Sequence, residues 1–228
     1  MDQTHRSQCQ FSLGIATSAA DVAGCMQRGQ LYALEARIPS LRFPLIARAI
    51  ASAFAAQAPC TVVVKARPEA YLAQLNTPHR LDLDAAFVSG ALGVLVMRED
   101  FAKRMFQFGA GRFTRELDGF GVAPGSLVVF EHAGDLLNLR DGALATRQLE
   151  ALGAWCQERD CTALLVVSGN PERNTVPVTD LLDAMSGLAR VEAGRGQLAV
   201  DVPYWRRPLP HHRSGHHRPG RGAGSGSG

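Results

Sequence analysis

Five short runs of mainly aliphatic residues constrain the fold of this chain more than any other feature. They are LYALEA (31–36), CTVVVKA (60–66), LGVLVM (92–97), SLVVFEH (126–132) and TALLVVS (162–168). Their apolar residues are continuous rather than alternating, which is typical of strands that are covered on both faces. Helical patterns separate the runs, so the sequence predicts a largely parallel sheet with right-handed crossover connections.

Three segments have the apolar spacing of helices that pack on such a sheet. The first has Pro44 in its first turn, where a missing N–H is harmless. The second follows Asp141, which is a plausible N-cap, and the third opens at Pro177. Their apolar positions are Leu45, Ile46, Ala49, Ile50, Ala53 and Phe54; Ala145, Leu149, Leu152 and Cys156; and Val178, Leu181, Leu182 and Met185.

The pattern changes after the third helix, where LARVEA (188–193) and QLAVDVPYW (197–205) flank the tripeptide GRG. Two strands joined by a glycine-containing turn are typical of a hairpin. The predicted fold is therefore α/β: a doubly wound, mostly parallel sheet with helices on both faces and a C-terminal hairpin.

The last 23 residues, 206–228, differ in composition from the rest, and we predict one folded domain over 1–205. The tail consists mostly of Arg, His, Pro, Gly and Ser, so it cannot bury enough surface to offset the entropy of ordering and is expected to be disordered. Truncated or out-of-frame sequence from a GC-rich gene is an alternative explanation of it. Its four histidines lack a folded frame, so no metal site is predicted there. They are His211, His212, His216 and His217.

Charge and hydropathy exclude several functional classes. The net charge is +3, but residues 1–205 carry −2 once the five arginines of the tail are removed, so no nucleic-acid partner is expected. No apolar run is long enough to span a membrane, and the N-terminus does not have the layout of a signal peptide. We therefore expect a cytoplasmic protein whose five cysteines are reduced thiols.

The connection after the first strand does not have the residues of a nucleotide loop. A P-loop would read GxxxxGK[ST], so that backbone amides and a lysine surround the phosphates. This chain has RIPSLRFPLIA (37–47), with no glycine, no lysine and two prolines. Glu131, at the end of the fourth run, resembles the acid that holds Mg²⁺ in P-loop enzymes, but without the loop it is weak evidence.

Other combinations of reactive residues are no stronger, so no catalytic, cofactor-binding or metal-binding residue is predicted. His132, Asp135 and Ser168 suggest a catalytic triad, yet no GxSxG elbow presents the serine. Cys156 and Cys161 with His132 lack any feature that would lower a thiol pKa. The RELD tetrapeptide (115–118) matches an RxxD pattern used by some cyclic-di-GMP sites, although such spacing is usually a local ion pair.

The glycine-containing stretch QFGAGRFTRELDGFG (107–121) could also be taken for a phosphate loop. A phosphate loop requires a strand, then glycines, then a helix. Here a helical pattern already begins at Asp100 and leads into the glycines, and a strand follows them. We interpret Gly109 and Gly111 as close-packing positions along an apolar helical face.

Several long segments resemble the N-terminal domain of BcsE, an accessory protein of bacterial cellulose secretion. They are RIPSLRFPLIARAI (37–50), CTVVVKARPEAYLAQL (60–75), the stretch from MREDF to LNLRD (97–141), TALLVVSG (162–169), MSGLARVEAG (185–194) and LAVDVPYW (198–205). The resemblance spans nearly all of 10–205 and none of the tail. It implies a degenerate RecA-like NTPase fold without a P-loop, and a scaffold rather than an enzyme.

The resemblance also implies partners. Family members bind cyclic-di-GMP through a later GGDEF-like domain that has no counterpart in this sequence, so this chain is not expected to bind the dinucleotide. Other subunits of the cellulose secretion system are the expected partners, including a small membrane-anchored protein that would recruit the chain to the inner membrane. The alternative is a RecA-like regulatory ATPase with an unorthodox nucleotide site.

Overall fold

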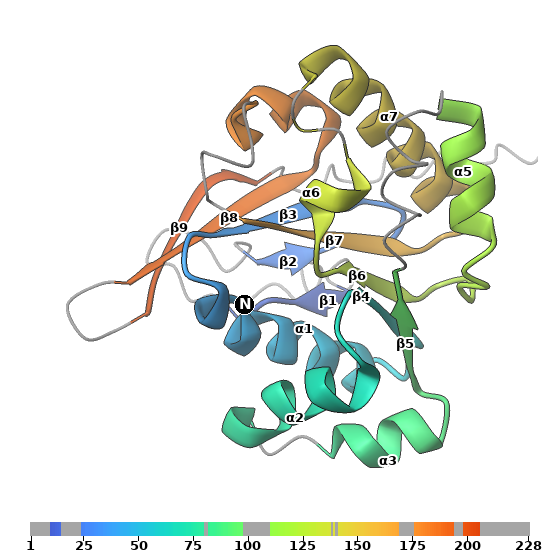
Figure 1. Ribbon diagram of the computed structural model, residues 1–228, viewed down its shortest axis with the longest axis vertical. Coiled ribbons are helices and arrows are strands. Elements are labelled where there is room, and N and C mark those ends of the chain that lie inside the picture. The colour runs from blue at the N-terminus through green and yellow to red at the C-terminus, as the bar shows by residue number, and fades with distance from the viewer. Residues whose placement is uncertain are drawn as a thin grey trace, which may run out of the picture.

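A seven-stranded sheet forms the centre of the molecule in the computed structural model (Figure 1). The structure describes residues 10–14, 24–79, 82–97, 110–137, 139, 141–168, 176–193 and 198–205. The strand order is β5-β4-β6-β7-β3-β8-β9. The strands are β3 (Leu31–Ala36), β4 (Cys60–Val64), β5 (Leu92–Val96), β6 (Leu127–Phe130), β7 (Thr162–Ser168), β8 (Gly187–Ala193) and β9 (Leu198–Trp205).

The direction of the strands confirms the predicted sheet. The strands from β5 to β8 pair in parallel, for example Leu34 with Val166 and Val62 with Val129. Among the described strands of this sheet only β9 is antiparallel, and it pairs with β8 as the predicted hairpin at one edge. All five continuous apolar runs are strands of this sheet.

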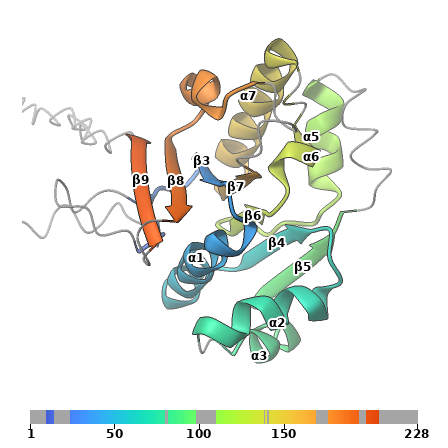
Figure 2. The same ribbon diagram turned by 60° about the vertical axis from the view of Figure 1, so that its left-hand side comes forward.

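Helices cover both faces of the sheet, as predicted (Figure 2). One apolar core lies under the first three helices and the other under the later ones, and adjacent strand residues such as Val62 and Val63 enter different cores. The first group comprises α1 (Phe43–Ala55), α2 (Pro68–His79) and α3 (Leu83–Val88). The second comprises α5 (Ala110–Asp118), α6 (Ala133–Leu136), α7 (Gly142–Glu158) and the 3-10 helix η3 (Val178–Ala184).

The predicted helix signals are confirmed, with one difference in helix type. Pro44 lies in the first turn of α1, and the Asp141 carboxylate accepts a hydrogen bond from the Leu144 N–H at 3.1 Å as the N-cap of α7. The segment after Pro177 is a 3-10 helix rather than an α-helix. Its seven residues include a threonine and two aspartates, which are weak α-helix formers in so short a segment.

Removing the α7 cap has a predictable effect. The substitution Asp141→Ala should lower the free energy of unfolding by about 1 kcal/mol, because it leaves a first-turn N–H without its acceptor. Glu150→Ala, at an exposed position within the same helix, should change it by less than about 0.5 kcal/mol. Urea denaturation of both variants measures the difference, and equal stabilities would contradict the capping role.

A small two-stranded sheet, β1 (Phe11–Ser12) with β2 (Cys25–Met26), was not predicted. Phe11 and Met26 are fully buried in the core beneath α1, and the Ser12 N–H donates to Ser52 Oγ at 2.7 Å. Cys25 is disulfide-bonded, so the prediction of reduced thiols is wrong for that residue. It holds for Cys60, Cys156 and Cys161, which are free and buried.

Two predicted segments lie outside the described residues, wholly or in part. The tail 206–228 and the helical pattern 100–109 are outside, so the close packing predicted at Gly109 stays a prediction. The glycine stretch continues as α5, where Leu117 is fully buried and Phe120 packs against the same core. This part of the predicted apolar face is confirmed.

Candidate functional site

The carboxyl ends of β4 and β6 flank the place where a doubly wound sheet most often binds a ligand. These strands are neighbours in parallel, yet the chain leaves β4 for α2 on one face and leaves β6 for α6 and α7 on the other. Connections that diverge to opposite faces open a crevice outside the strand ends. The 3-10 helix η2 (Pro39–Arg42), which follows β3, leads into α1 near the same end of the sheet.

Glu131, the first residue after β6, has both carboxylate oxygens engaged by other parts of the chain. Arg42, the last residue of η2, donates from Nε to Oε1 in a short, part-buried ion pair. The Tyr71 hydroxyl, from α2, contacts Oε2 at 3.4 Å, which is long for a hydroxyl donor. Three connections that are distant in sequence therefore meet at one carboxylate.

The cluster is largely removed from water. The Glu131 side chain is 2% exposed and that of Arg42 is 14% exposed. Burial raises the pKa of Glu131 above its usual value, although Arg42 and the hydrogen bonds oppose the rise. Burial, and then the charge of Glu131, raise the pKa of Tyr71 well above its usual value, so its hydroxyl stays protonated and can donate.

The Phe43 ring also helps to hold the guanidinium of Arg42. The guanidinium carbon lies 5.1 Å from the centre of that ring, within range of a cation–π interaction. The connection that would contain the glycines and lysine of a P-loop instead supplies an arginine that pairs with the acid. Glu131 could be identified from the sequence, whereas Arg42 and Tyr71 could not, because they lie 89 and 60 residues away from it.

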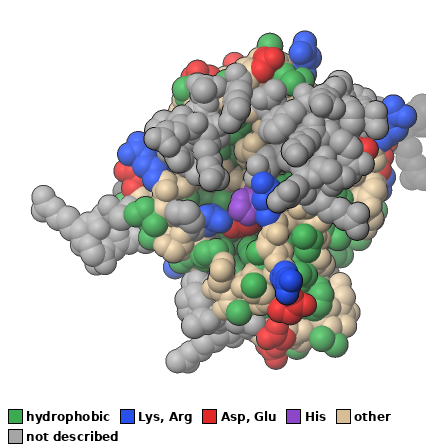
Figure 3. Space-filling model, in the orientation of Figure 1, with side chains coloured by type: hydrophobic (Ala, Val, Ile, Leu, Met, Phe, Trp, Pro, Cys, Tyr) green, Lys and Arg blue, Asp and Glu red, His purple; other side chains and the backbone are tan. Residues whose placement is uncertain are grey.

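A magnesium-dependent nucleotide site needs an acid whose oxygens can reach the metal and its waters. At Glu131 one oxygen faces a guanidinium and the other a tyrosine hydroxyl. Within the described residues, no group of three or more His, Cys, Asp or Glu side chains could hold a metal ion. Figure 3 shows basic, acidic and histidine side chains gathered near the centre of one face of the molecule.

Comparison with known proteins identifies the family of the chain. The family described as "Cellulose biosynthesis protein BcsE, N-terminal domain" matches residues 7–208. The chain belongs to this family. No curated protein matches the sequence.

The fold of this BcsE-family chain recurs widely. It is similar to the crystal structure of the flagellar accessory protein FlaH from Methanocaldococcus jannaschii, with a TM-score of 0.60 and 14% identity over 84% of this chain and 87% of that one. In all, 579 solved chains match, so the fold by itself indicates no particular activity. The architecture is the predicted RecA-like α/β fold, and the connection 37–47 lacks a P-loop sequence.

The Cys–His combination considered from the sequence is not brought together in the BcsE-family fold. Cys161 precedes β7 and lies at the amino end of the sheet, whereas His132 follows the carboxyl end of β6. Along the strand direction, Cys161 and His132 are therefore separated by five to six residues, which corresponds to roughly 16–20 Å. No cysteine chemistry assisted by His132 is available to Cys161.

The remaining candidates are placed only in part. His132 is half-buried at the N-cap of α6. Ser168 pairs with Ala36 in the sheet, but its side chain and that of Asp135 lie outside the described residues, so the triad is untested.

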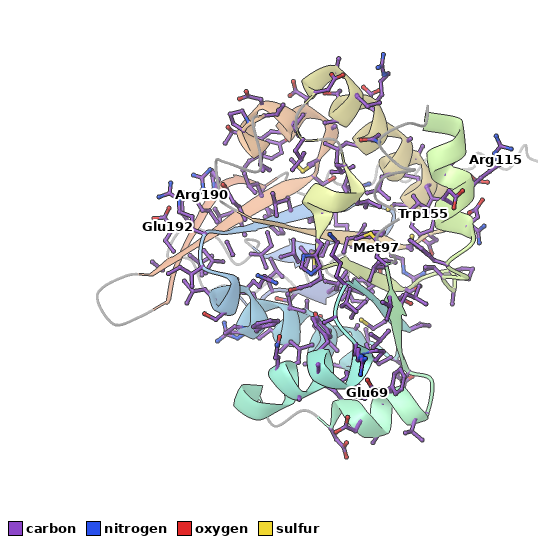
Figure 4. The ribbon with its side chains drawn as sticks, viewed as in Figure 1. Glu69, Met97, Arg115, Trp155, Arg190 and Glu192 are labelled. Atoms are coloured by element: carbon purple, nitrogen blue, oxygen red, sulfur yellow. The ribbon has the colours of Figure 1, made fainter. Side chains whose placement is uncertain are left out.

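The RxxD residues lie on α5, away from the Glu131 cluster. Asp118 accepts hydrogen bonds from Trp155 Nε1 at 2.9 Å and from Arg159 at 2.6 Å. Trp155 lies between α7 and α5, whereas Arg115 projects from the outer side of α5 (Figure 4). Through these hydrogen bonds Asp118 links α5 to α7.

Proposed function

We propose that this chain is a non-catalytic accessory domain, a scaffold of the bacterial cellulose synthesis system. Membership of the BcsE N-terminal family supports a role in cellulose biosynthesis. The observation that carries the non-catalytic part is the buried pair of Arg42 with Glu131. Arg42 binds the Glu131 carboxylate from the connection 37–47, which is where a P-loop would need its phosphate-binding residues.

A metal ion that binds Glu131 through Oε1 would have to displace Arg42 from that oxygen. Breaking one side of a buried ion pair leaves the other charge uncompensated, at a cost of about 3–5 kcal/mol. A magnesium ion could offset this cost only if the phosphates of the nucleotide were also bound. The connection RIPSLRFPLIA has neither the lysine nor the flexible glycines that would bind them. The pair therefore favours a structural role for this crevice.

The proposed partners are other subunits of the cellulose secretion system. In this proposal a small membrane-anchored subunit brings the domain to the inner membrane. None of the helices in the described part of the chain has the length and apolar composition needed to cross a bilayer. We do not expect this chain alone to bind cyclic-di-GMP, and a micromolar dissociation constant would refute our domain assignment.

One observation favours a second function, a regulatory ATPase. Glu131 lies at the end of a central parallel strand of a RecA-like sheet, which is the position of a metal-binding acid in P-loop enzymes. That function requires Arg42 to leave Glu131 when nucleotide binds. Calorimetry with nucleotide distinguishes the two functions.

Affinity capture tests the scaffold function. The tagged chain, expressed in cells that express the cellulose operon, should recover at least one subunit of the secretion system, identified by mass spectrometry. The control is the affinity tag expressed alone in the same cells, which should recover none of these subunits. Recovery of no cellulose subunit by the wild-type chain would refute the scaffold function.

A further inference from the structure

Two cysteines occupy paired positions at the C-terminal end of α7. The Cys161 N–H donates to the Cys156 carbonyl at 3.0 Å, and the Asp160 N–H donates to the Gln157 carbonyl at 3.3 Å. Asp160 has a φ of 53°, in the left-handed region. These bonds define a Schellman motif, in which the residues in the positions of Cys156 and Cys161 usually make a side-chain contact across the end of the helix.

In this chain both contacting side chains are thiols. Cys156 and Cys161 are free and fully buried, and their thiol groups are hydrogen-bonded to each other. The contact normally made by two apolar side chains therefore brings two sulfur atoms together. A disulfide requires two backbones that approach closely and Cβ atoms directed toward each other, and the 3.0 Å backbone hydrogen bond joins these two residues directly.

We propose that Cys156 and Cys161 form a reversible disulfide on exposure to hydrogen peroxide, which makes the end of α7 an oxidation site. This inference is independent of the proposed scaffold function. The Cys161 thiolate attacks one peroxide oxygen, and after protonation of the leaving hydroxide the products are a sulfenic acid and water. The Cys156 thiol then attacks the sulfenic sulfur and releases a second water as the S–S bond forms. Two thiols and one peroxide thus give one disulfide and two waters.

The surroundings assign the order of the two steps. The hydrogen bond with Cys156 lowers the pKa of Cys161, and the charge of Arg159 adds to the effect. Burial and the charge of Asp160 oppose it. The same hydrogen bond, together with burial, raises the pKa of Cys156 well above its usual value. We assign Cys161, the thiol closer to the charge of Arg159, as the first nucleophile and Cys156 as the resolving thiol, and the same disulfide forms in either order.

Access depends on a single turn. The turn between the two cysteines contains Arg159 and Asp160, whose side chains are 35% and 52% exposed. Helix ends open more readily than helix interiors, and peroxide is small, so fraying of this turn is enough to admit it. An S–S bond would then fix the turn whose Asp160 forms an ion pair with Arg28 at 2.8 Å.

Peptide mapping tests the proposal on the whole chain. After peroxide treatment, free thiols are alkylated under denaturing conditions and the chain is digested with trypsin without reduction. Cleavage at Arg159 separates the two cysteines, so a disulfide should link peptide 148–159 to peptide 160–173 with the loss of two hydrogen atoms. Cys60 is the internal control, because burial raises its pKa to about 12, and it should stay alkylatable.

Melting temperatures of the wild type and of two cysteine variants distinguish this disulfide from other oxidation products. Peroxide should raise the Tm of the wild type by about 5 °C, and it should not raise that of Cys161→Ser or Cys156→Ser. If both variants fail to fold, the wild-type peptide map decides by itself. The proposal is wrong if Cys156 and Cys161 remain fully alkylatable after treatment, or if either is linked to Cys25 instead.

Discussion

Replacing Gly187 by valine is expected to lower the free energy of unfolding by about 3 kcal/mol, at the upper end of the usual overpacking cost. Gly187 opens β8 beneath a pair of stacked rings, Tyr32 and Trp205, whose centres are 4.9 Å apart. A Cβ atom at position 187 would lie 2.6 Å from Trp205 Cε3 and 2.9 Å from Tyr32 Cδ1. Both rings are held by hydrogen bonds: the Trp205 indole N–H donates to the Cys25 carbonyl at 2.8 Å, and the Tyr32 hydroxyl accepts from the Gln27 N–H at 3.0 Å.

Gly153→Ala is the matched control for that substitution. Gly153 lies inside α7, and a Cβ there would meet no heavy atom within 4 Å beyond the helix's own backbone. Alanine at a helix interior should raise stability by up to about 1 kcal/mol. Guanidinium denaturation of the two variants should therefore show shifts of opposite sign, and similar stabilities for Gly187→Val and wild type would contradict the packing at Trp205.

Replacing Arg42 by alanine is expected to cost about 3 kcal/mol at pH 8, because it leaves the Glu131 carboxylate buried without its counter-charge. The cost should be smaller at pH 5. The folded-state pKa of Glu131 is already raised by burial, and loss of Arg42 raises it further. A carboxyl group whose pKa is raised in the folded state stabilises the fold at pH values below its unfolded-state pKa. This stabilisation is lost as the pH rises through its folded-state pKa, so the variant loses more stability at pH 8.

Two controls isolate the Arg42–Glu131 pair. Arg28→Ala breaks an exposed pair with Asp160, whose side chains are 58% and 52% exposed, and should cost less than about 1 kcal/mol. In a Glu131→Gln background, the Arg42→Ala substitution should lose most of its cost and its dependence on pH. Denaturation at pH 5 and pH 8 measures all three, and an equal cost at both values would refute the coupling.

The strands could be predicted because burial on both faces leaves a strong local signal. Runs such as LVVF (127–130) and ALLVV (163–167) have no polar face, and in the structure their neighbouring residues enter the two cores alternately. The N-cap of α7, Asp141, could also be predicted from the sequence, because its hydrogen bond is local and reaches only to the Leu144 N–H. The two-residue strands β1 and β2 were missed because they are too short for any periodicity.

The Glu131 cluster could be predicted only in part. Glu131 stands out as an acid after an apolar strand, but its partner Arg42 depends on strand order, which the sequence does not specify. Tyr71 was not singled out from the sequence, and only the packing of α2 against α1 brings its hydroxyl to the carboxylate. Long-range polar pairs of this kind depend on tertiary structure rather than on local pattern.

Calorimetric titration of the purified chain with ATP and Mg²⁺ tests most directly whether the Arg42–Glu131 pair replaces a nucleotide site. No saturable heat is expected up to millimolar nucleotide, and none is expected for the Glu131→Gln variant. Saturable heat with the wild type that disappears in Glu131→Gln would show that the crevice binds nucleotide and would contradict the scaffold function.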